Sequence, residues 1–207
     1  MYYNTLSLIY HFLYCKESYA YGKEPNAYFK KIIDTLFPGK ILLAAEGEGR
    51  NAVYAASLGW DVYAYDFSEM AYKKAMKLAA ENNVSIQYQV ASLSDLEFPE
   101  NFFAAIGLIY VHFPDPIRHT NHELLSRLLK NEGHVILEAF SSNHSSYQRK
   151  NPAVGGPKIE SQLYNELKLK NDFKSYKFLI LKEEEIHLSE GEHHNGLTTV
   201  MRMVAKK

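Results

Sequence analysis

The sequence predicts an α/β fold built on a doubly wound, largely parallel sheet. Two observations support this prediction. Apolar, strand-like runs alternate with segments of helical periodicity along most of the 207 residues, and the first such pair is joined by a turn that contains two glycines. Alternation of this kind is typical of sheets covered by helices on both faces. The length suits one domain with a substantial core.

A strand, a glycine turn and a helix form the most informative segment. Lys40–Ala45 is a short apolar run, Gly47 and Gly49 follow it, and Asn51–Leu58 carries apolar residues at helical spacing. A lone pair of glycines is common in turns, but this pair lies between a buried type of strand and the start of a helix. The order therefore predicts a nucleotide-binding βαβ unit.

The next strand ends at Asp66, where a carboxylate can accept both ribose hydroxyls of an adenosine. The turn departs from the dinucleotide fingerprint, because Ala52 or a neighbour stands where a third glycine would admit a pyrophosphate. Glu46 and Glu48 also make the turn acidic, which disfavours a pyrophosphate and favours a cofactor with ammonium and sulfonium groups. S-adenosylmethionine is that cofactor, with NAD or a purely structural turn as alternatives.

The later segments continue the alternation of strands and helices. In chain order they are a helix at Glu69–Glu81 with Ser68 as its N-cap, strands at Ser85–Val90 and Phe103–Tyr110, a helix at Thr120–Leu129, a strand at His134–Phe140, and strand-like runs at Phe178–Leu188 and Leu197–Lys206. A glycine-bounded turn joins the last two runs, which predicts an antiparallel hairpin at the end of the chain.

Loop-forming residues fill Ser141–Pro157, just past the carboxyl end of the fifth strand. Ligands bind at that edge of open α/β sheets, and loops of this length are uncommon unless they are functional or disordered. We therefore predict a substrate lid. Tyr147 is a candidate aromatic wall of the substrate site. Arg149 could attract an anionic substrate there, with a merely solvated charge as the alternative.

Composition argues for small-molecule chemistry in the cytoplasm. A formal net charge of -1 lacks the basic excess that nucleic-acid binders carry. The single cysteine excludes an internal disulfide and is compatible with a reducing compartment. The apolar start of the chain has neither a basic leader nor a small-residue cleavage site and is too short to span a bilayer, so no membrane partner is expected.

Four segments together resemble class I S-adenosylmethionine-dependent methyltransferases, and within them the tellurite-resistance and thiopurine S-methyltransferase group. The segments are Tyr19–Asn26, Ala45–Ala52, Ile109–Pro114 and the C-terminal E-G-E-H-H-N-G with V-M-R-M-V. The resemblance implies a Rossmann-like, seven-stranded mixed sheet with an antiparallel last strand in a three-layer αβα arrangement. It also implies one methyltransferase domain over residues 1–207, with a cap at 1–30, a lid at 141–165, and a monomer or weak homodimer.

The resemblance also implies a set of cofactor-binding residues. These are Tyr21, Gly22, Glu46, Gly47, Gly49, Asn51, Asp66, Phe67, Ser92, Leu93 and Tyr110. Four positions depart from the common family pattern, namely Leu43, Ala45, Ser92 and Ala104. If no neighbouring residue compensates for them, the chain would be a non-catalytic binder of S-adenosylmethionine. An NAD-dependent oxidoreductase of the same architecture is the second alternative.

Methyl transfer needs alignment and desolvation more than acid–base chemistry. The expected acceptor is a small molecule carrying a thiol, a related chalcogen or a small amine. His112, just past the fourth strand, is the candidate general base, and packing against Phe113 is the alternative. His194 and Glu190 could line the pocket, or merely stabilise the turn that holds them.

No metal site is expected. His119 and His122 are three residues apart on a predicted helix, but their spacing does not match zinc motifs. We interpret both as surface residues.

Overall fold

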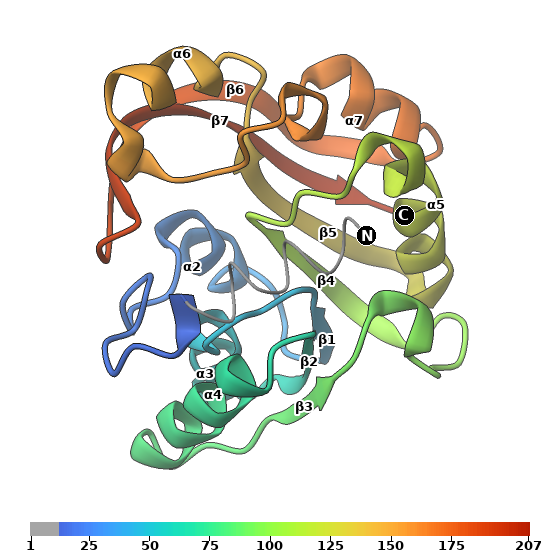
Figure 1. Ribbon diagram of the computed structural model, residues 1–207. Coiled ribbons are helices and arrows are strands. Elements are labelled where there is room, and N and C mark those ends of the chain that lie inside the picture. The colour runs from blue at the N-terminus through green and yellow to red at the C-terminus, as the bar shows by residue number, and fades with distance from the viewer. Residues whose placement is uncertain (1–12) are drawn as a thin grey trace. The chain divides into compact units, whose positions relative to one another are not determined.

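The structure, a computed structural model, describes residues 13–207 and divides along the chain into two compact units, with the boundary between Glu97 and Phe98. The first twelve residues of the predicted cap lie outside the described part. Seven strands form a sheet in the order β3-β2-β1-β4-β5-β7-β6, and helices flank the strands (Figure 1). The last strand is antiparallel to its neighbours, which confirms the predicted mixed sheet.

The first unit contains three parallel strands and their connecting helices. Its elements are α2 (Ala27–Ile33), β1 (Lys40–Leu43), α3 (Arg50–Ser57), β2 (Asp61–Asp66), α4 (Glu69–Glu81), β3 (Gln87–Val90) and the short 3-10 helix η1 (Leu93–Asp95). β2 pairs with β1 on one side and β3 on the other. The Ser68 side chain accepts from the backbone N–H of Ala71, so the predicted cap of α4 is present.

Helices α3 and α4 approach closely at Gly49. This glycine precedes α3 with φ 88°, in the left-handed region. A Cβ on Gly49 would lie 2.6 Å from the Cβ of Ala75 on α4. A side chain at this position would therefore strain the backbone and push the two helices apart.

The second unit contains the remaining four strands. Its elements are β4 (Phe103–Ile109), α5 (Asp115–Leu128), β5 (Leu129–Phe140), α6 (His144–Lys150), the 3-10 helices η2 (Pro152–Val154) and η3 (Glu160–Gln162), α7 (Glu166–Asp172), β6 (Lys177–Glu190) and β7 (His194–Lys206). β4 and β5 are parallel, whereas β7 runs antiparallel to β5 and β6. The predicted terminal hairpin is therefore confirmed, with both strands longer than expected.

Two predicted boundaries around α5 were wrong. The helix begins at Asp115, five residues earlier than expected, with a proline in its first turn where a missing N–H does no harm. The next strand begins at Leu129, not His134, because Leu129 pairs with Phe103. The register then shifts before Ala105 pairs with His134. The residues between Leu129 and His134, which were predicted to separate helix from strand, therefore form an irregular part of β5.

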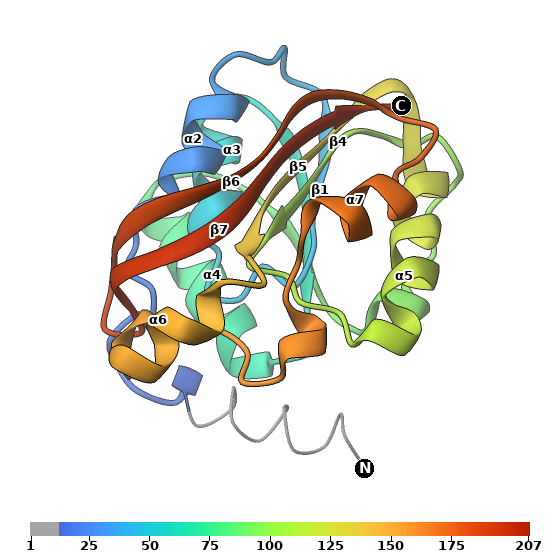
Figure 2. The ribbon, with the colours of Figure 1, turned by 90° about the horizontal axis from the view of Figure 1, so that it is seen from above.

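Residues 141–157 fold into short helices, so the prediction of an irregular loop was wrong. Figure 2 shows α6 beside the turn of the β6–β7 hairpin. A Cβ on Gly155 would lie 2.2 Å from the carbonyl oxygen of His193, and one on Gly196 would lie 2.3 Å from Nδ2 of Asn151. Asn151 Nδ2 also donates to the carbonyl oxygen of Asn195 over 3.1 Å. The segment is therefore packed tightly against the hairpin turn, and its action as a lid stays a prediction.

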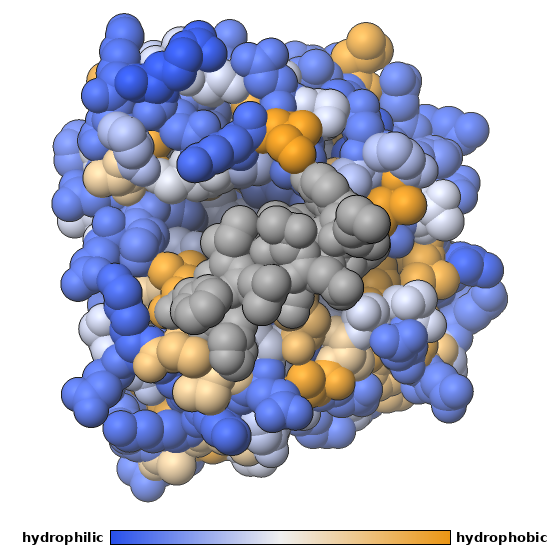
Figure 3. Space-filling model, in the orientation of Figure 1, coloured by the Kyte–Doolittle hydropathy of each residue, from blue (hydrophilic) through white to orange (hydrophobic). Residues whose placement is uncertain are grey.

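The surface is largely polar where Figure 3 shows it. Apolar residues are scattered among hydrophilic ones on that face, and scattered exposed apolar side chains are normal in folded proteins. Over residues 13–207, no helix is long and apolar enough to cross a membrane.

Candidate functional site

Three residues of the turn between β1 and α3 have backbone angles in the left-handed region. Ala45, Gly47 and Gly49 have φ of 45°, 64° and 88°. An alanine in this region is strained by about 1–2 kcal/mol, which explains why a glycine suits the position of Ala45. A Cβ on Gly47 would lie 2.9 Å from the hydroxyl oxygen of Tyr14. The turn therefore presents bare backbone at the carboxyl end of β1.

Glu46 caps the helix that follows this turn. Its Oε1 accepts from the backbone N–H groups of Asn51 and Ala52, each over 2.8 Å. Burial raises the pKa of Glu46 to about 7, although these hydrogen bonds oppose the shift. Asn51 also accepts from the backbone N–H of Asn26 over 2.9 Å and so ties α2 to the turn.

Asp66 lies at the end of β2 and is 3% exposed. Its Oδ2 accepts from the N–H of Gly47 over 3.1 Å, and its Oδ1 accepts from the N–H of Ser68 over 3.0 Å. Burial raises its pKa to about 6. The fold therefore brings the carboxylate predicted to hold ribose directly beside the predicted glycine turn.

Glu48, by contrast, does not add free negative charge to the turn. It is 5% exposed, pairs with Lys74 Nζ over 2.7 Å and accepts from the N–H of Ala20 over 2.7 Å. The expectation that two glutamates make the turn acidic therefore holds for Glu46 alone. Sequence reasoning missed this pairing because Lys74 belongs to α4.

The N-terminal segment reaches the same turn. Arg50 Nη1 donates to the carbonyl oxygen of Tyr21 over 3.1 Å, and Gly22 completes a turn with φ 74°. Tyr21 and Gly22 thus lie next to the glycine turn, and their role in binding the cofactor stays a prediction. Tyr88 was missed by sequence reasoning, yet its hydroxyl donates to the carbonyl oxygen of Gly47 over 2.6 Å and so braces the turn.

Three residues of the predicted cofactor-binding set, which the family resemblance places against adenine, follow β2 and β3. Phe67 is 41% exposed, as a ring that offers a face to a ligand would be. Ser92 and Leu93 begin η1, where the N–H of Ser92 donates to Asp95 over 3.2 Å in a capping box. Leu93 is buried. Asp95 supplies a carboxylate near the position where Ser92 departs from the family pattern.

In the second unit, His112 has both ring nitrogens engaged. Nε2 accepts from the N–H of Phe140 over 3.2 Å, so Nδ1 must carry the proton that it donates to the carbonyl oxygen of Gln162 over 2.9 Å. Burial lowers its pKa to about 4. These contacts are with Gln162 and Phe140 rather than with Phe113, and they leave no ring nitrogen to accept a proton from a substrate.

Four rings surround Phe140, and we call this group the Phe140 cluster. Ring centroids lie 4.9 Å away for Tyr110, 5.7 Å for His112, 4.0 Å for His144 and 5.3 Å for His194. Tyr110 follows β4 with φ 56°, and Phe140 ends β5. The cluster therefore occupies the strand ends where parallel sheets bind ligands.

His144 was missed by sequence reasoning. It is fully buried, with Nδ1 2.6 Å from Oγ1 of Thr198 and Nε2 3.0 Å from the carbonyl oxygen of Gly155. Burial lowers its pKa to about 4, so the ring is neutral at physiological pH. Its nitrogens join residues 141–157 to β7.

The other predicted acceptor-site residues make local contacts. Nδ1 of His194 lies 3.4 Å from Oε2 of Glu190, across the hairpin turn, as the turn-stabilising alternative requires. The Tyr147 hydroxyl donates to Glu185 on β6. Arg149 lies 3.8 Å from Glu160, and both side chains are largely exposed. Their roles toward a substrate stay predictions.

The helix histidines share one carboxylate. Nδ1 of His119 lies 3.1 Å from Oδ1 of Asp172, and Nδ1 of His122 lies 2.9 Å from Oδ2. His122 is fully buried, so its prediction as a surface residue was wrong. Within the described residues, no group of three or more histidine, cysteine or acidic side chains could hold a metal ion.

The first-unit site suits a cofactor with cationic and hydroxyl groups. Two carboxylates have pKa values raised by burial: Glu46 lies within the glycine turn, and Asp66 lies beside it. A ligand ammonium or hydroxyl would stabilise the charged form of either group. Together with the strand order, this site defines a class I methyltransferase.

The comparisons with known proteins support the same class. A family profile described as a methyltransferase domain matches residues 41–133. An uncharacterized methyltransferase of Schizosaccharomyces pombe is 34% identical over 106 residues, which cover 48% of this chain and 71% of the relative. The chain belongs to the S-adenosylmethionine-dependent methyltransferases, and S-adenosylmethionine is its cofactor.

TehB of Haemophilus influenzae, a probable S-adenosyl-L-methionine-dependent methyltransferase, is 23% identical over 202 residues, which cover 94% of this chain and 68% of TehB. Its crystal structure has a TM-score of 0.70 at 20% identity and covers 88% of this chain and 62% of that one. A structure from work on the conversion of a disulfide bond into a thioacetal group during echinomycin biosynthesis has a TM-score of 0.71 at 20% identity, covering 97% of this chain and 90% of that one. At such identity, the structural likeness shows the shared fold.

Proposed function

We propose that this methyltransferase acts on a small molecule whose reacting atom is the sulfur of a thiol or a related chalcogen, with a small amine as the second candidate. The hydrogen bonds of His112 are the main support for a sulfur or chalcogen acceptor. Both of its nitrogens are held by backbone groups, and burial lowers its pKa to about 4. A histidine in this state is poorly suited to deprotonate an amine or a hydroxyl. A thiol ionises much more readily and needs no dedicated base.

When bound, S-adenosylmethionine supplies a methyl group already activated by a sulfonium charge, so the chain has to bind, align and exclude water. In this proposal Glu46 binds the ammonium group of the cofactor and Asp66 binds its ribose hydroxyls. Their raised pKa values support both assignments, because each carboxylate gains most from a ligand that favours its charged form. Phe67 contacts adenine through its exposed face.

The Phe140 cluster is the proposed acceptor site. Neutral, buried rings such as His144 exclude water. The loss of its hydration shell makes a soft nucleophile such as a thiolate more reactive. The relative studied for conversion of a disulfide bond into a thioacetal group adds support for a sulfur acceptor. The resemblance of four sequence segments to the tellurite-resistance group supports a related chalcogen.

An acceptor panel tests the proposal. Purified protein is incubated with S-adenosylmethionine and thiols, selenide, tellurite with a reductant, or small amines, and S-adenosylhomocysteine release is measured. We expect release with a thiol or chalcogen acceptor. Turnover with amines alone would contradict the chalcogen assignment. Binding of S-adenosylhomocysteine without turnover on any acceptor would support the non-catalytic alternative, and binding of NAD alone would support the oxidoreductase.

Cofactor affinity should rise with pH through about 7. The pKa of Glu46 is raised to about 7, so its carboxyl is increasingly protonated below that pH and cannot pair with an ammonium group. We expect affinity for S-adenosylhomocysteine to fall about tenfold per pH unit below 7, as measured by calorimetry. The Glu46→Gln variant should lose this dependence between pH 7 and pH 6, whereas below pH 6 protonation of Asp66 should lower the affinity of both proteins. An equal pH dependence in wild type and variant would show that Glu46 does not bind the ammonium group.

A further inference from the structure

Tyr110, a member of the Phe140 cluster, has a strained backbone. Its φ of 56° lies in the left-handed region, which a residue with a bulky side chain rarely adopts. Strain of this kind persists only where the surrounding structure holds it, and it is concentrated at active and ligand-binding sites. The contacts that hold Tyr110 in place therefore bear on the proposed acceptor site.

Glu138 on β5 holds Tyr110 at both its backbone and its side chain. The N–H of Tyr110 donates to the carbonyl oxygen of Glu138 over 2.7 Å, and the Tyr110 hydroxyl donates to Oε1 of Glu138 over 3.0 Å. Phe140 lies two residues further along β5 and therefore on the same face of the sheet. The Tyr110 side chain thus extends along this face, with its hydroxyl at Glu138 and its ring against Phe140.

Arg202 fixes the Glu138 carboxylate. Glu138 is 1% exposed, and its Oε2 accepts from Arg202 Nε over 2.6 Å. The two residues lie directly opposite each other on β5 and β7. A carboxylate this deeply buried needs such a partner. Because Arg202 holds one oxygen, the other oxygen is kept in place to accept from the Tyr110 hydroxyl.

We propose that Glu138 is a positioning residue for methyl transfer, which holds the Tyr110 ring as a wall of the acceptor site in contact with the reacting sulfur. This inference rests on the proposed function, since it takes the Phe140 cluster as the acceptor site. Tyr110 is only partly buried, so part of its ring can meet a ligand. Sulfur makes favourable contacts with aromatic rings. A fixed wall matters here because methyl transfer depends on the alignment of the acceptor.

Fluorine NMR tests the proposal without turnover, with 3-fluorotyrosine in place of Tyr110. Benzenethiol is titrated in the presence of S-adenosylhomocysteine. We expect one narrow resonance that shifts saturably with benzenethiol. In Glu138→Gln, Arg202 takes the remaining carbonyl oxygen, so an amide NH₂ group faces the Tyr110 hydroxyl. The resonance should then broaden or split, and the shift should need about tenfold more benzenethiol.

Kinetics with benzenethiol give a second readout. Tyr110→Phe and Glu138→Gln should each lower kcat/KM about tenfold, and the double variant should be no slower than either, because both changes remove the same contact. Stability should behave differently. Only Glu138→Gln leaves Arg202 without its buried partner, so it should lower the urea midpoint, and the double variant should unfold like Glu138→Gln. A merely structural role would not produce this difference.

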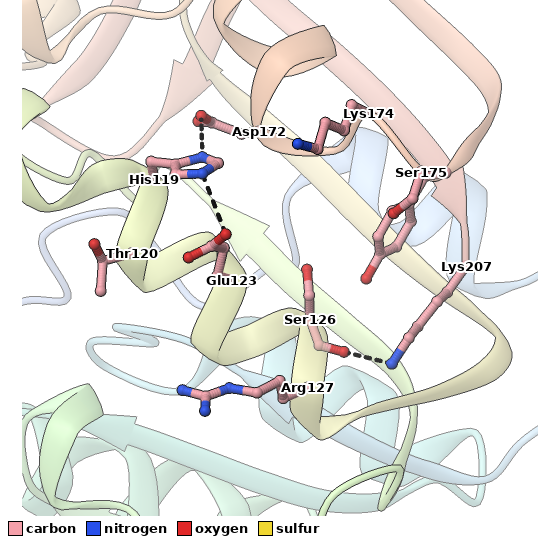
Figure 4. A pocket seen from close by; sticks show the side chains of 10 residues that line it. His119, Thr120, Glu123, Ser126, Arg127, Asp172, Lys174, Ser175 and Lys207 are labelled. Carbon is pink, nitrogen blue, oxygen red and sulfur yellow. Dashed lines mark hydrogen bonds and ion pairs between the residues drawn. The ribbon is translucent and has the colours of Figure 1, made fainter.

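Each readout has a matched control. Glu184 accepts from Nη1 of the same Arg202 over 2.7 Å at the more exposed end of this group of charges, so Glu184→Gln removes an equal charge. It should leave kcat/KM and the resonance unchanged. For the probe, 3-fluorotyrosine replaces Tyr176, which lines a pocket together with Lys207 (Figure 4). Lys207 bonds to the carbonyl oxygen of Leu129, at the opposite end of β5 from Phe140. This resonance should not respond to benzenethiol.

The outcomes separate this proposal from the proposed function. A resonance at Tyr110 that benzenethiol does not move, an equal response at Tyr176, or additive losses of kcat/KM in the double variant would overturn the role of Glu138. A saturable shift at Tyr110 that Glu138→Gln weakens, without turnover on any acceptor, would support the positioned wall and contradict methyl transfer to a thiol. Turnover of benzenethiol with an unmoved resonance would do the reverse.

Discussion

The substitution Asp172→Asn should lower the free energy of unfolding by about 3–5 kcal/mol, the range for removing one partner of a buried charge pair. Asp172 is 8% exposed. Its Oδ2 accepts from Arg118 Nε over 2.7 Å and lies 2.9 Å from Nδ1 of His122. An asparagine would present an amide N–H to donors and leave the Arg118 charge without its buried partner.

This loss should depend on pH in a defined direction. Burial alone would raise the pKa of Asp172, but hydrogen bonds from His122 and Arg118 outweigh it and hold the pKa at about 2. A carboxyl with a depressed pKa stabilises the fold above its unfolded value and loses that contribution as pH falls toward the folded one. The difference between wild type and Asp172→Asn should therefore shrink between about pH 4 and pH 2.

Urea unfolding followed by far-UV circular dichroism measures this effect. Fluorescence is less suitable, because the single tryptophan, Trp60, belongs to the first unit. Glu166→Gln is the control, since this exposed glutamate of α7 pairs only with the exposed Lys170 in the described residues. It should change stability by less than about 0.5 kcal/mol. A loss below 1 kcal/mol for Asp172→Asn would show that the cluster contributes little.

The substitution Asp66→Asn should weaken binding of S-adenosylhomocysteine about 100-fold, or about 2.7 kcal/mol. Both Asp66 oxygens already accept from backbone N–H groups, of Gly47 and Ser68. An amide at this position would turn one acceptor into a donor facing another donor. It would also remove the charge that accepts the ribose hydroxyls.

Asp61→Asn is a matched control for this prediction. Asp61 begins the same strand, its side chain is 44% exposed, and it pairs with Lys40. The control removes the same charge at the other end of β2 and should leave affinity unchanged. Calorimetry measures both variants, and melting curves establish that they are folded. An affinity for Asp66→Asn within threefold of wild type would contradict the ribose assignment.

Features encoded by neighbouring residues could be predicted from the sequence. The succession of strands and helices in the first unit follows from apolar runs that alternate with helical periodicity, and Asp66 ends its strand beside the turn because parallel strands place their carboxyl ends at one edge. Local periodicity, turn chemistry and chain order were enough for these features. Tyr21 and Gly22 were assigned to the cofactor site by family resemblance alone, and the structure places Tyr21 in contact with Arg50, at the start of α3.

Features that depend on distant partners could not be predicted. His112 bonds to Gln162 and Phe140, which are 50 and 28 residues away, so its spacing alone left base and packing roles equally open. His122 is buried by contacts that include Asp172, also 50 residues away. The short helices in residues 141–157 depend on contacts with β7, and their loop-rich composition gave no sign of them.

The contacts of Gly155 and Gly196 bear on attempts to change acceptor preference by loop grafting. Each glycine has an atom of the opposite segment where a side chain would begin, so residues 151–156 are fitted to residues 193–196, which run from the hairpin turn into the start of β7. A single segment taken from a homologue would carry side chains shaped for the homologue's other segment and would clash with this one. Chimeras should therefore exchange both segments together, and libraries that vary one of them should keep these glycines fixed.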